Sequence, residues 1–414
     1  MKIWLITTGE PPPFHGDRPH RTGILSEMLC ELGHKVTWWT TSFDHQKKKY
    51  LYKDHTEINV EKNFKLVFLH AATPYYKNIS LARIRNHQEI SDIFEREARK
   101  KERPDIIFTS FPTIDLAFKS VKYGLANQIP VVVDVRDLWP DIFVDPFPLV
   151  LKPFVRLALC PYFLKTSYIF KNAHAITGVS QKYLNFGLKY AKRVVSAKDK
   201  VFPLGYRSVD GNLTNYDQNE FTQLKVCREQ INILFVGTFG RTYDLSTIIK
   251  AAKYLEKSHP NVMFIFTGDG ENMDLWKKES LSLSNIVFTG WVGKRELDYL
   301  SSISRVGLMA YAKGAPQGLP NKVFEYMAYG LPILSSLQGE TKELLEKEKI
   351  GLTYNAGCHK DLLLKFSYLL DNQDSLNEMS QNSGGTFKRK FTSAGIYKKL
   401  INHLLEILSS YPKK

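Results

Sequence analysis

The feature that most constrains this chain is a regular alternation of short β-branched and aromatic runs with longer amphipathic stretches. Such alternation predicts parallel strands with helices packed on both faces of the sheet. The first half contains six expected strands, at residues 2–7, 35–41, 65–70, 105–110, 131–134 and 173–179. The pattern begins again in the second half, at residues 231–236, 262–267, 285–289, 306–310, 333–336 and 352–354. We therefore expect an α/β fold of two doubly wound, Rossmann-like domains.

Amphipathic stretches lie between these runs, at residues 22–32, 81–101, 114–123, 244–255, 272–282, 294–301 and 321–329. Residues 206–230 are polar and lack a clear period, which is typical of a linker. We expect domains at residues 1–205 and 206–390, the second including the linker, and a final segment 391–414 with a helix at 396–408. Open parallel sheets bind ligands beyond the carboxyl ends of their strands, so the loops at those ends are the places to look for chemistry.

The composition is that of an ordinary globular protein, because 43% of the residues are hydrophobic and 24% are charged. A net charge of +15 favours partners that carry phosphate or anionic lipid. The four cysteines show no Cys-x-x-Cys spacing, so neither a disulfide framework nor a zinc site is expected and a reducing compartment fits best. The apolar start is too short for a signal peptide, and no stretch is apolar over the about 18 residues of a membrane span. We expect a cytoplasmic or peripheral protein.

A basic and aromatic segment follows the fifth expected strand. Residues 151–203 contain ten basic side chains and one acidic side chain, or +9 of the total charge of +15. Within residues 147–170, basic residues stand among Phe, Leu and Tyr, which is typical of a helix that lies on an anionic membrane surface. The alternative is a buried crossover helix whose lysines extend to water. Pro153 and Pro161 interrupt the helical pattern in either case.

Two loops of the second half carry the residues of a phosphate site. The turn Gly237-Thr238-Phe239-Gly240-Arg241 leads from a strand into a helix and offers backbone N–H groups and a guanidinium to an anion. Because any doubly wound domain has such a turn, the turn alone is weak evidence for a phosphate site. The segment 314–334 is more informative. There Lys322 lies in the first turn of an expected helix, where it opposes the helix dipole unless an anion such as a diphosphate compensates.

Glu325 follows Lys322 on the same helix face and can accept two hydrogen bonds from a vicinal diol, as the ribose hydroxyls require. The alternative is a plain surface Lys–Glu pair. Taken with its flanks, the segment reads Pro-x-Lys-x-x-Glu-Tyr-Met-Ala-x-Gly-x-Pro over residues 320–332. This pattern resembles the donor-binding signature of retaining glycosyltransferases of the GT-B fold, and most of all the large fourth family that includes bacterial lipopolysaccharide, O-antigen and capsule transferases.

The resemblance extends along the chain from Met1 to the terminal helix. Residues 235–241, Phe-Thr-Gly-Asp-Gly at 266–270 and Val-Phe-Thr-Gly-Trp-Val at 287–292 follow in the family's order and spacing. Residues 134–140, Asp-Val-Arg-Asp-Leu-Trp-Pro, look like a segment of the subgroup that builds O-antigen and colanic-acid-type polysaccharides. The resemblance implies a GT-B architecture with an acceptor-binding domain at 1–205, a donor-binding domain at 206–390 and a final helix that crosses back to the first domain.

The resemblance also implies roles for single residues. Arg241 and Lys322 would neutralise the donor diphosphate, Glu325 would hold the ribose, and residues 290–292 would contact the base. The expected donor-binding set is Gly16, Gly237, Gly240, Arg241, Gly268, Trp291, Val292, Gln317, Gly318, Leu319, Lys322 and Glu325. Two departures stand out: Gln317 occupies the first position of the family's Glu-x7-Glu pattern, and Ser246 stands where many members have a lysine.

In the first domain, the polar loop at residues 15–21 would approach the donor phosphates or the acceptor. Its His15 and His20 are expected to be solvent or structural histidines rather than catalysts. Asp137 aligns roughly with a catalytic His or Asp of the family and is expected in the active site, together with Arg241 and Lys322. The alternative is that Asp137 and Asp141 cap turns around Trp139 and Pro140.

The resemblance implies retaining transfer of a hexosyl or N-acetylhexosaminyl group from a nucleotide sugar, with UDP preferred. The acceptor is expected to be a saccharide linked to polyprenyl diphosphate, in cell-surface polysaccharide biosynthesis at the inner face of the cell membrane. No cofactor or metal is expected, because Arg241 and Lys322 can stabilise the departing diphosphate and no Asp-x-Asp motif occurs. The alternatives are another GT-B enzyme such as a sugar-nucleotide epimerase or a phosphorylase, an inactive donor-binding protein, and a nucleic-acid binder, for which no recognition motif is found.

Overall fold

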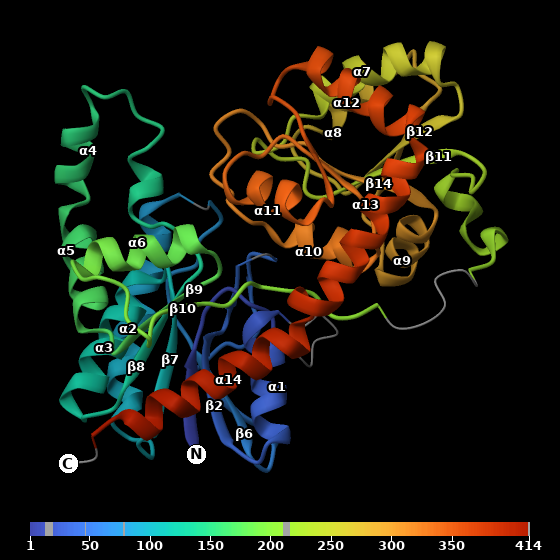
Figure 1. Ribbon diagram of the computed structural model, residues 1–414. Helices are drawn as coiled ribbons and strands as arrows, with labels where there is room; N and C mark the ends of the chain where they lie inside the picture. Colours follow the sequence, from blue (N-terminus) through green and yellow to red (C-terminus); the bar gives the residue numbers. More distant parts are fainter. Residues whose placement is uncertain (13–19, 46, 78, 210–215, 413–414) are drawn as a thin grey trace. The chain divides into compact units, whose positions relative to one another are not determined.

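The computed structural model describes residues 1–12, 20–45, 47–77, 79–209 and 216–412. The chain divides into two compact units (Figure 1). Unit 1 contains Met1–Pro203 and Ala394–Lys414, and unit 2 contains Leu204–Ser393. The expected linker at 206–230 therefore belongs to unit 2, and the terminal helix belongs to unit 1.

Unit 1 is built on an eight-stranded sheet with the order β10-β9-β8-β7-β1-β2-β6-β5. Its neighbouring strands are parallel, except that β5 pairs antiparallel with β6. The strands are β1 Lys2–Ile6, β2 Lys35–Thr41, β5 Thr56–Glu61, β6 Phe64–Leu69, β7 Ile106–Phe111, β8 Val131–Val135, β9 Ala175–Gly178 and β10 Lys200–Val201. A separate antiparallel pair consists of β3 Phe43–Asp44 and β4 Lys49–Tyr50.

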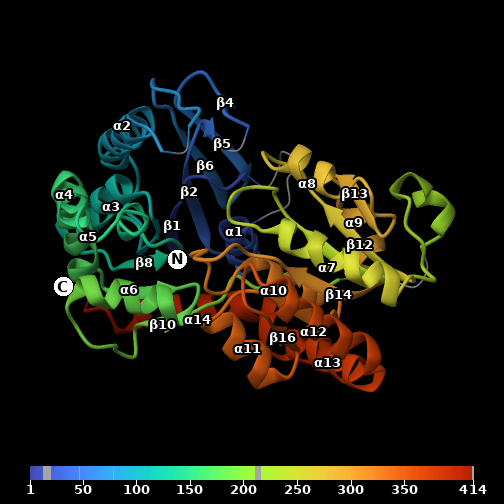
Figure 2. The ribbon, with the colours of Figure 1, turned by 90° about the horizontal axis from the view of Figure 1, so that it is seen from above.

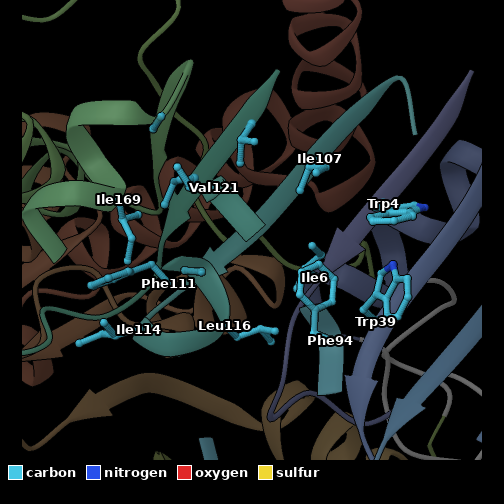
Figure 3. Close-up of a cluster of buried hydrophobic side chains, with 14 of the residues drawn as sticks. Trp4, Ile6, Trp39, Phe94, Ile107, Phe111, Ile114, Leu116, Val121 and Ile169 are labelled. Carbon is cyan, nitrogen blue, oxygen red and sulfur yellow. The ribbon is translucent and has the colours of Figure 1, made fainter. Parts of the chain in front are cut away.

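Helices cover both faces of this sheet, so its central strands β7 and β8 are buried along their whole length. The helices are α1 Arg21–Glu31, α2 Leu81–Ala98, α3 Ile114–Ala126, α4 Lys152–Ala158, α5 Cys160–Asn172, α6 Gln181–Ala191 and α14 Ser393–Ser410, with a 3-10 turn η1 at Asp141–Phe143. On one face α2, α3, α5 and α6 pack in a row (Figure 2). Figure 3 shows the core beneath them, where Trp4 of β1 and Trp39 of β2 lie 5.0 Å apart by ring centroid and Phe94 packs at their edges.

Unit 2 has a six-stranded, wholly parallel sheet with the order β13-β12-β11-β14-β15-β16. Its strands are β11 Ile231–Val236, β12 Val262–Thr267, β13 Ile286–Gly290, β14 Ser304–Met309, β15 Ile333–Ser335 and β16 Gly351–Thr353. Its helical elements are η3 Gln218–Leu224, α7 Leu245–Ser258, α8 Met273–Glu279, α9 Lys294–Ser302, α10 Asn321–Ala328, α11 Glu340–Glu348, α12 His359–Asp371, α13 Gln373–Thr386 and η4 Phe387–Phe391. The expected α/β fold of two doubly wound domains is confirmed.

The strand order fixes where each unit can bind a ligand. In unit 1 the chain adds β2 and then β6 on one side of β1. From β7, on the other side of β1, it adds β8, β9 and β10 in the opposite direction. Unit 2 repeats this arrangement with β11 and β14. The loops after β1 and β7, and after β11 and β14, therefore leave in opposite directions and open a crevice at the carboxyl ends of these strands.

Residues 147–158 of the basic and aromatic segment are largely exposed, so the prediction of a buried crossover helix is wrong for them, whereas α5 packs against α3 and α6. Leu149 is 83% and Phe154 is 70% exposed, and α4 contains no buried residue. Only the end of α5 is buried, around Ile169 and Phe170. The two prolines do not interrupt helices; each stands in the first turn of α4 or α5, where its missing N–H has no partner to lose.

Candidate active site

Two glycines allow the loops after β11 and β12 to lie against each other. A Cβ at Gly268 would lie 1.8 Å from the carbonyl oxygen of Gly237, and one at Gly270 would lie 2.8 Å from the backbone nitrogen of Phe239. Gly268 and Gly270 also have φ angles of 134° and 156°, which favour glycine. Backbone hydrogen bonds from Gly237 to Thr267 and from Gly268 to Gly290 join the loops. At Gly268 and Gly270 these loops therefore lie closer together than a residue with a Cβ would allow.

Lys322 lies in the first turn of α10 and is only 7% exposed. The expectation of a plain surface Lys–Glu pair is therefore wrong. Its ammonium nitrogen lies 4.1 Å from the ring centroid of Phe235 and 4.5 Å from that of Tyr243. Within the described residues, Nζ has no hydrogen-bond partner. Burial lowers the pKa of Lys322 to about 7, although the nearby Glu325 raises it.

A buried amine without a partner is costly, so its position indicates an anionic ligand. Lys322 sits where the strand order of unit 2 reverses, because its neighbour Phe235 lies near the end of β11 and the loop after β14 leads into α10. An isolated bridge between Tyr243 and Tyr311 and a hydrogen bond from the Asp244 N–H to the Ala310 carbonyl join the two loops. This site combines an amine, glycine turns and a helix N-terminus in one crevice.

Glu325 follows one turn later, and its Oε1 accepts a hydrogen bond of 2.9 Å from the hydroxyl of Tyr206. Tyr206 lies in the expected linker, and nothing in the sequence pattern marks it. It is held in place by a parallel bridge to Thr392. The tyrosine therefore orients the carboxylate that the sequence predicts for the ribose.

The other predicted residues differ in exposure. The side chain of Arg241 is 89% exposed and its Nε lies 3.4 Å from Glu271, so a ligand contact requires Arg241 to leave Glu271. Trp291 is exposed after β13, and Val292 is partly buried beside it. Gly240 lies in the turn after β11, and a Cβ there would meet no atom within 4 Å.

The loop before α10 contains a second polar atom without a partner. Oε1 of Gln317 is buried and, within the described residues, has no hydrogen-bond partner. The next residue, Gly318, is fixed through its carbonyl, which accepts from Thr341. Leu319 is partly buried and leads into the helix. An amide oxygen that lacks a donor suits a ligand hydroxyl.

In unit 1, the predicted segment 134–140 divides into a structural part and a part near a cavity. Asp134 is buried and accepts from Arg21 Nε at 2.9 Å, from Arg136 Nε at 2.8 Å and from Thr177. Burial raises the pKa of Asp134, but the two guanidinium groups outweigh it and hold the pKa at about 2. Arg21, from the loop expected to approach the ligands, is thus a structural residue.

Asp137 lies apart from this network and is partly buried. Its carboxylate accepts from the backbone of Leu138 at 2.8 Å and from the side chain of Trp139, and burial raises its pKa. Asp141 instead accepts from the hydroxyl of Tyr190. Asp137 thus contacts the backbone of its own turn, whereas Asp141 contacts a side chain of α6. A catalytic role for Asp137 stays a prediction, and Gly16 and His15 lie outside the described residues.

No group of three His, Cys, Asp or Glu side chains within the described residues is placed to hold a metal ion. None of the described helices has the length and hydropathy that crossing a bilayer requires.

Two doubly wound units, each with ligand loops where its strand order reverses, place the chain in the GT-B class of glycosyltransferase folds. Residues 217–384 match the family model of the glycosyl transferases group 1. The matched range contains the glycine turns, Gln317, Lys322 and Glu325. The predicted resemblance is therefore confirmed.

Two curated relatives come from Bacillus subtilis (strain 168). TuaH, named as a teichuronic acid biosynthesis glycosyltransferase, is 31% identical over 121 residues, which are 28% of this chain and 29% of TuaH. Spore coat protein SA is 27% identical over 128 residues, which are 29% of this chain and 33% of that protein. The alignments thus span about a third or less of each relative.

Solved structures resemble the whole chain. Sucrose-phosphate synthase from Thermosynechococcus elongatus has a TM-score of 0.72 at 17% identity, with 99% of each chain covered. WaaG, a glycosyltransferase involved in lipopolysaccharide biosynthesis, has a TM-score of 0.66 at 14% identity, and the match covers 97% of this chain and 99% of WaaG. HepE from Anabaena, in complex with UDP-glucose, has a TM-score of 0.64 at 13% identity, and the match covers 98% of this chain and 100% of HepE. At these identities the likeness shows the shared fold.

Proposed function

We propose that the protein is a retaining, metal-independent glycosyltransferase that moves a hexosyl or N-acetylhexosaminyl group from a nucleotide sugar, preferably a UDP-sugar, to a saccharide. The observation that carries this proposal is the buried ammonium of Lys322, which has no hydrogen-bond partner within the described residues and lies in the first turn of α10. The family match of residues 217–384 and the UDP-sugar bound to HepE support it. A role in cell-surface polysaccharide biosynthesis is supported by the name of TuaH.

In this mechanism the bond between the anomeric carbon and the diphosphate oxygen breaks, and the acceptor oxygen bonds to the same face of that carbon. Lys322 and the N–H groups at the start of α10 stabilise the negative charge on the departing oxygen. Glu325, oriented by Tyr206, accepts hydrogen bonds from the ribose hydroxyls. Arg241 turns from Glu271 onto the diphosphate. The departing phosphate takes the proton of the acceptor hydroxyl, so the products are a glycoside and the nucleoside diphosphate.

A thermal-shift screen of UDP-, GDP- and TDP-sugars tests the donor. A ligand at a hundred times its dissociation constant stabilises the folded protein by about 2.7 kcal/mol. Lys322→Ala should abolish this shift and lower the transfer rate by roughly 30- to 1000-fold. The matched control, Lys277→Ala on exposed α8, should change neither. Absence of a shift with any nucleotide sugar would contradict the donor site.

Transfer of radiolabelled sugar to an acceptor separates the enzyme from an inactive donor-binding protein. Product analysis separates it from an epimerase, which would return an altered nucleotide sugar. EDTA should leave the transfer rate largely unchanged. A loss of activity that only magnesium restores would overturn metal independence.

We further propose that the protein works at the inner face of the cell membrane on a saccharide linked to polyprenyl diphosphate. The support is the exposed apolar segment, which we define as Phe147, Leu149, Val150, Leu151, Phe154, Leu157 and Leu164. Lys152 and Arg156 lie within it on α4. Each basic group near an anionic leaflet contributes about 1 kcal/mol, and apolar insertion adds to this.

Vesicle co-sedimentation tests the membrane proposal. Binding should rise with phosphatidylglycerol content, fall with salt and drop when Lys152 and Arg156 both become Glu. Lys165 is left unchanged because it pairs with Asp115 inside unit 1. The control is the double change of exposed Lys277 and Lys278 to Glu, which alters the net charge equally. Equal loss in both variants, or no binding at low salt, would refute a specific docking segment.

A further inference from the structure

The chain passes between the two units twice, and two short segments of unit 2 lie next to these passages. The passages are at residues 203–204 and 393–394. The N–H of Tyr206 donates to the carbonyl of Phe391 at 3.1 Å, and the N–H of Ser393 donates to the carbonyl of Tyr206 at 2.7 Å. A parallel bridge between Tyr206 and Thr392 completes the pairing. We call residues 204–206 and 391–393 the paired connector.

Both segments of the paired connector are fastened to α10. The hydroxyl of Tyr206 donates to Oε1 of Glu325 at 2.9 Å. The ring of Phe391 lies 4.9 Å, by centroid, from that of Phe324, and both rings are buried. Phe324 and Glu325 are adjacent on the helix that carries Lys322 in its first turn. The helix of the candidate donor site therefore holds the two segments through which the chain enters and leaves unit 2.

The Tyr206 side chain is itself held in position. It is 9% exposed, and its ring lies 6.3 Å from that of Tyr329 in an edge-to-face arrangement. The hydroxyl of Tyr329 donates to Oδ1 of Asp298 at 2.5 Å, and Asp298 pairs with Lys294 at 2.6 Å. These contacts tie the Tyr206 ring to α9 through Tyr329. A movement of Glu325 or of the connector is therefore not absorbed by free rotation of this ring.

One carboxylate thus joins the paired connector to the place where the ribose is expected. A carboxylate offers about four acceptor positions, so Glu325 can accept from Tyr206 and from the ribose hydroxyls at the same time. Both interactions require an ordered Glu325 side chain, so the one that forms first removes part of the entropy cost of the other. Such coupling is reciprocal: if the nucleotide stabilises the connector, the connector stabilises the bound nucleotide by the same factor.

We propose that Tyr206 couples nucleotide binding to the paired connector, as a positioning residue that acts through Glu325. Ribose hydroxyls bound to Glu325 hold its carboxylate against the Tyr206 hydroxyl, and that hydrogen bond keeps residues 204–206 paired with residues 391–393. This coupling rests on the proposed function, since the ribose of the nucleotide sugar is the ligand of Glu325. The affinity for the donor therefore depends on the segments by which the chain enters and leaves unit 2.

Amide hydrogen exchange tests the coupling in the full chain, with UDP as the probe. The informative amides are those of Tyr206 and Ser393, which make the two backbone hydrogen bonds of the connector. Saturating UDP should slow their exchange by about 5- to 150-fold, the usual range of coupling between two sites. In Tyr206→Phe this slowing should be lost, and the affinity for UDP should fall by a similar factor because the coupling is reciprocal.

A nucleotide without ribose hydroxyls separates this coupling from a merely structural role of Tyr206. The probe 2′,3′-dideoxyuridine diphosphate keeps the diphosphate that Lys322 is proposed to bind, but it cannot donate ribose hydrogen bonds to Glu325. It should bind the wild type and Tyr206→Phe equally, and it should leave the exchange of the connector amides unchanged. An equal loss of affinity for UDP and for the dideoxy analogue in Tyr206→Phe would show that Tyr206 only supports the fold, which overturns the proposal.

Tyr368→Phe is the matched control, because it also removes one hydroxyl, but from an exposed side chain of α12, where that hydroxyl lies 3.3 Å from Ser375. It should change neither the UDP affinity nor the exchange. The comparison of the two nucleotides in the wild-type chain needs no variant, so it holds even if Tyr206→Phe fails to fold. Equal slowing by both nucleotides, or slowing that persists in Tyr206→Phe, refutes the coupling. UDP binding that depends on Lys322 but leaves the connector amides unchanged refutes the coupling alone, whereas the absence of UDP binding refutes the donor site.

Discussion

At the scale of single residues, the donor site depends on one amine that lacks a partner among the described residues. Lys322 has aromatic rings on two sides, and the space in front of it exists because residue 237 is glycine. A Cβ at that position would lie 2.6 Å from Nζ. The position of the Lys322 ammonium therefore depends on the space that glycine leaves at residue 237.

Gly237→Ala should move the ammonium of Lys322 and weaken UDP binding by about 10- to 100-fold, the effect of losing one charge-assisted hydrogen bond. Titration calorimetry measures the affinity. Gly384→Ala is the control, because a Cβ there would meet its nearest neighbour outside its own helix turn, the Cα of Gly330, at an ordinary 3.7 Å. Unchanged UDP affinity in Gly237→Ala would show that the ammonium does not contact the nucleotide.

The affinity for UDP should fall as the pH rises above about 7, because the pKa of Lys322 is lowered to about 7 mainly by burial and the neutral amine binds a diphosphate poorly. The limiting slope is tenfold per pH unit, since the phosphates are already ionised in this range. UDP binding should also take up a proton, which calorimetry in buffers of different ionisation enthalpy detects. Lys322→Arg stays charged and should lose this pH dependence. A flat wild-type profile from pH 7 to 9.5 would refute the assignment.

The sequence predicted Lys322, Glu325 and the glycine turns because each is part of a local pattern. It could not predict Tyr206, which reaches Glu325 from 119 residues away, because such a contact exists only after folding. The aromatic rings around Lys322 could not be predicted either, because they too come together only after folding. The sequence also could not show that Arg241 is turned toward Glu271, because side-chain direction depends on the surroundings.

At the scale of helices and strands, the central parallel strands were predictable because buried apolar runs are read directly from sequence. The short antiparallel elements were not: β5 alternates exposed and partly buried residues and adds to an edge. The expected linker contains η3, whose Phe221 stacks on Tyr299 at 4.2 Å. This contact and the packing of Tyr216 on the same ring join part of a polar segment to unit 2.

Phe221→Ala should destabilise unit 2 by about 3–5 kcal/mol, because it removes a buried ring from a stacked pair. Phe154→Ala, on exposed α4, should change the free energy of unfolding by no more than about 0.5 kcal/mol. Urea denaturation compares the two variants. Phe154→Ala should nevertheless reduce binding to anionic vesicles, and equal destabilisation by both changes would contradict the described burial.

At the scale of the whole molecule, each unit has its own sheet and core, so each should unfold as a cooperative block. The helix α14 is the last structural element of unit 1. It buries Ile396, Leu400, Leu404 and Ile407, and His403 Nε2 lies 2.9 Å from the carbonyl of Lys198. Unit 1 is therefore assembled from two separate parts of the chain.

Leu404→Ala should lower the stability of unit 1 by about 2–5 kcal/mol and leave unit 2 unchanged. Calorimetry should resolve two transitions, and saturating UDP should raise the transition of unit 2. Leu404→Ala should lower the temperature of the other transition, which belongs to unit 1. A shift of the UDP-sensitive transition by Leu404→Ala would contradict the assignment of α14 to unit 1.

The return of α14 to unit 1 has a consequence for the order of events on the ribosome. The chain leaves unit 1 at Pro203 and comes back at Ala394, so the 190 residues of unit 2, 204–393, are made in between. At about 5–20 residues per second, this interval is roughly 10–40 seconds. Throughout it, the apolar surface that α14 covers stays open on the nascent unit 1, while unit 2 emerges as one continuous stretch and can fold first. Unit 2, although it is made after most of unit 1, can therefore complete its fold before unit 1 does.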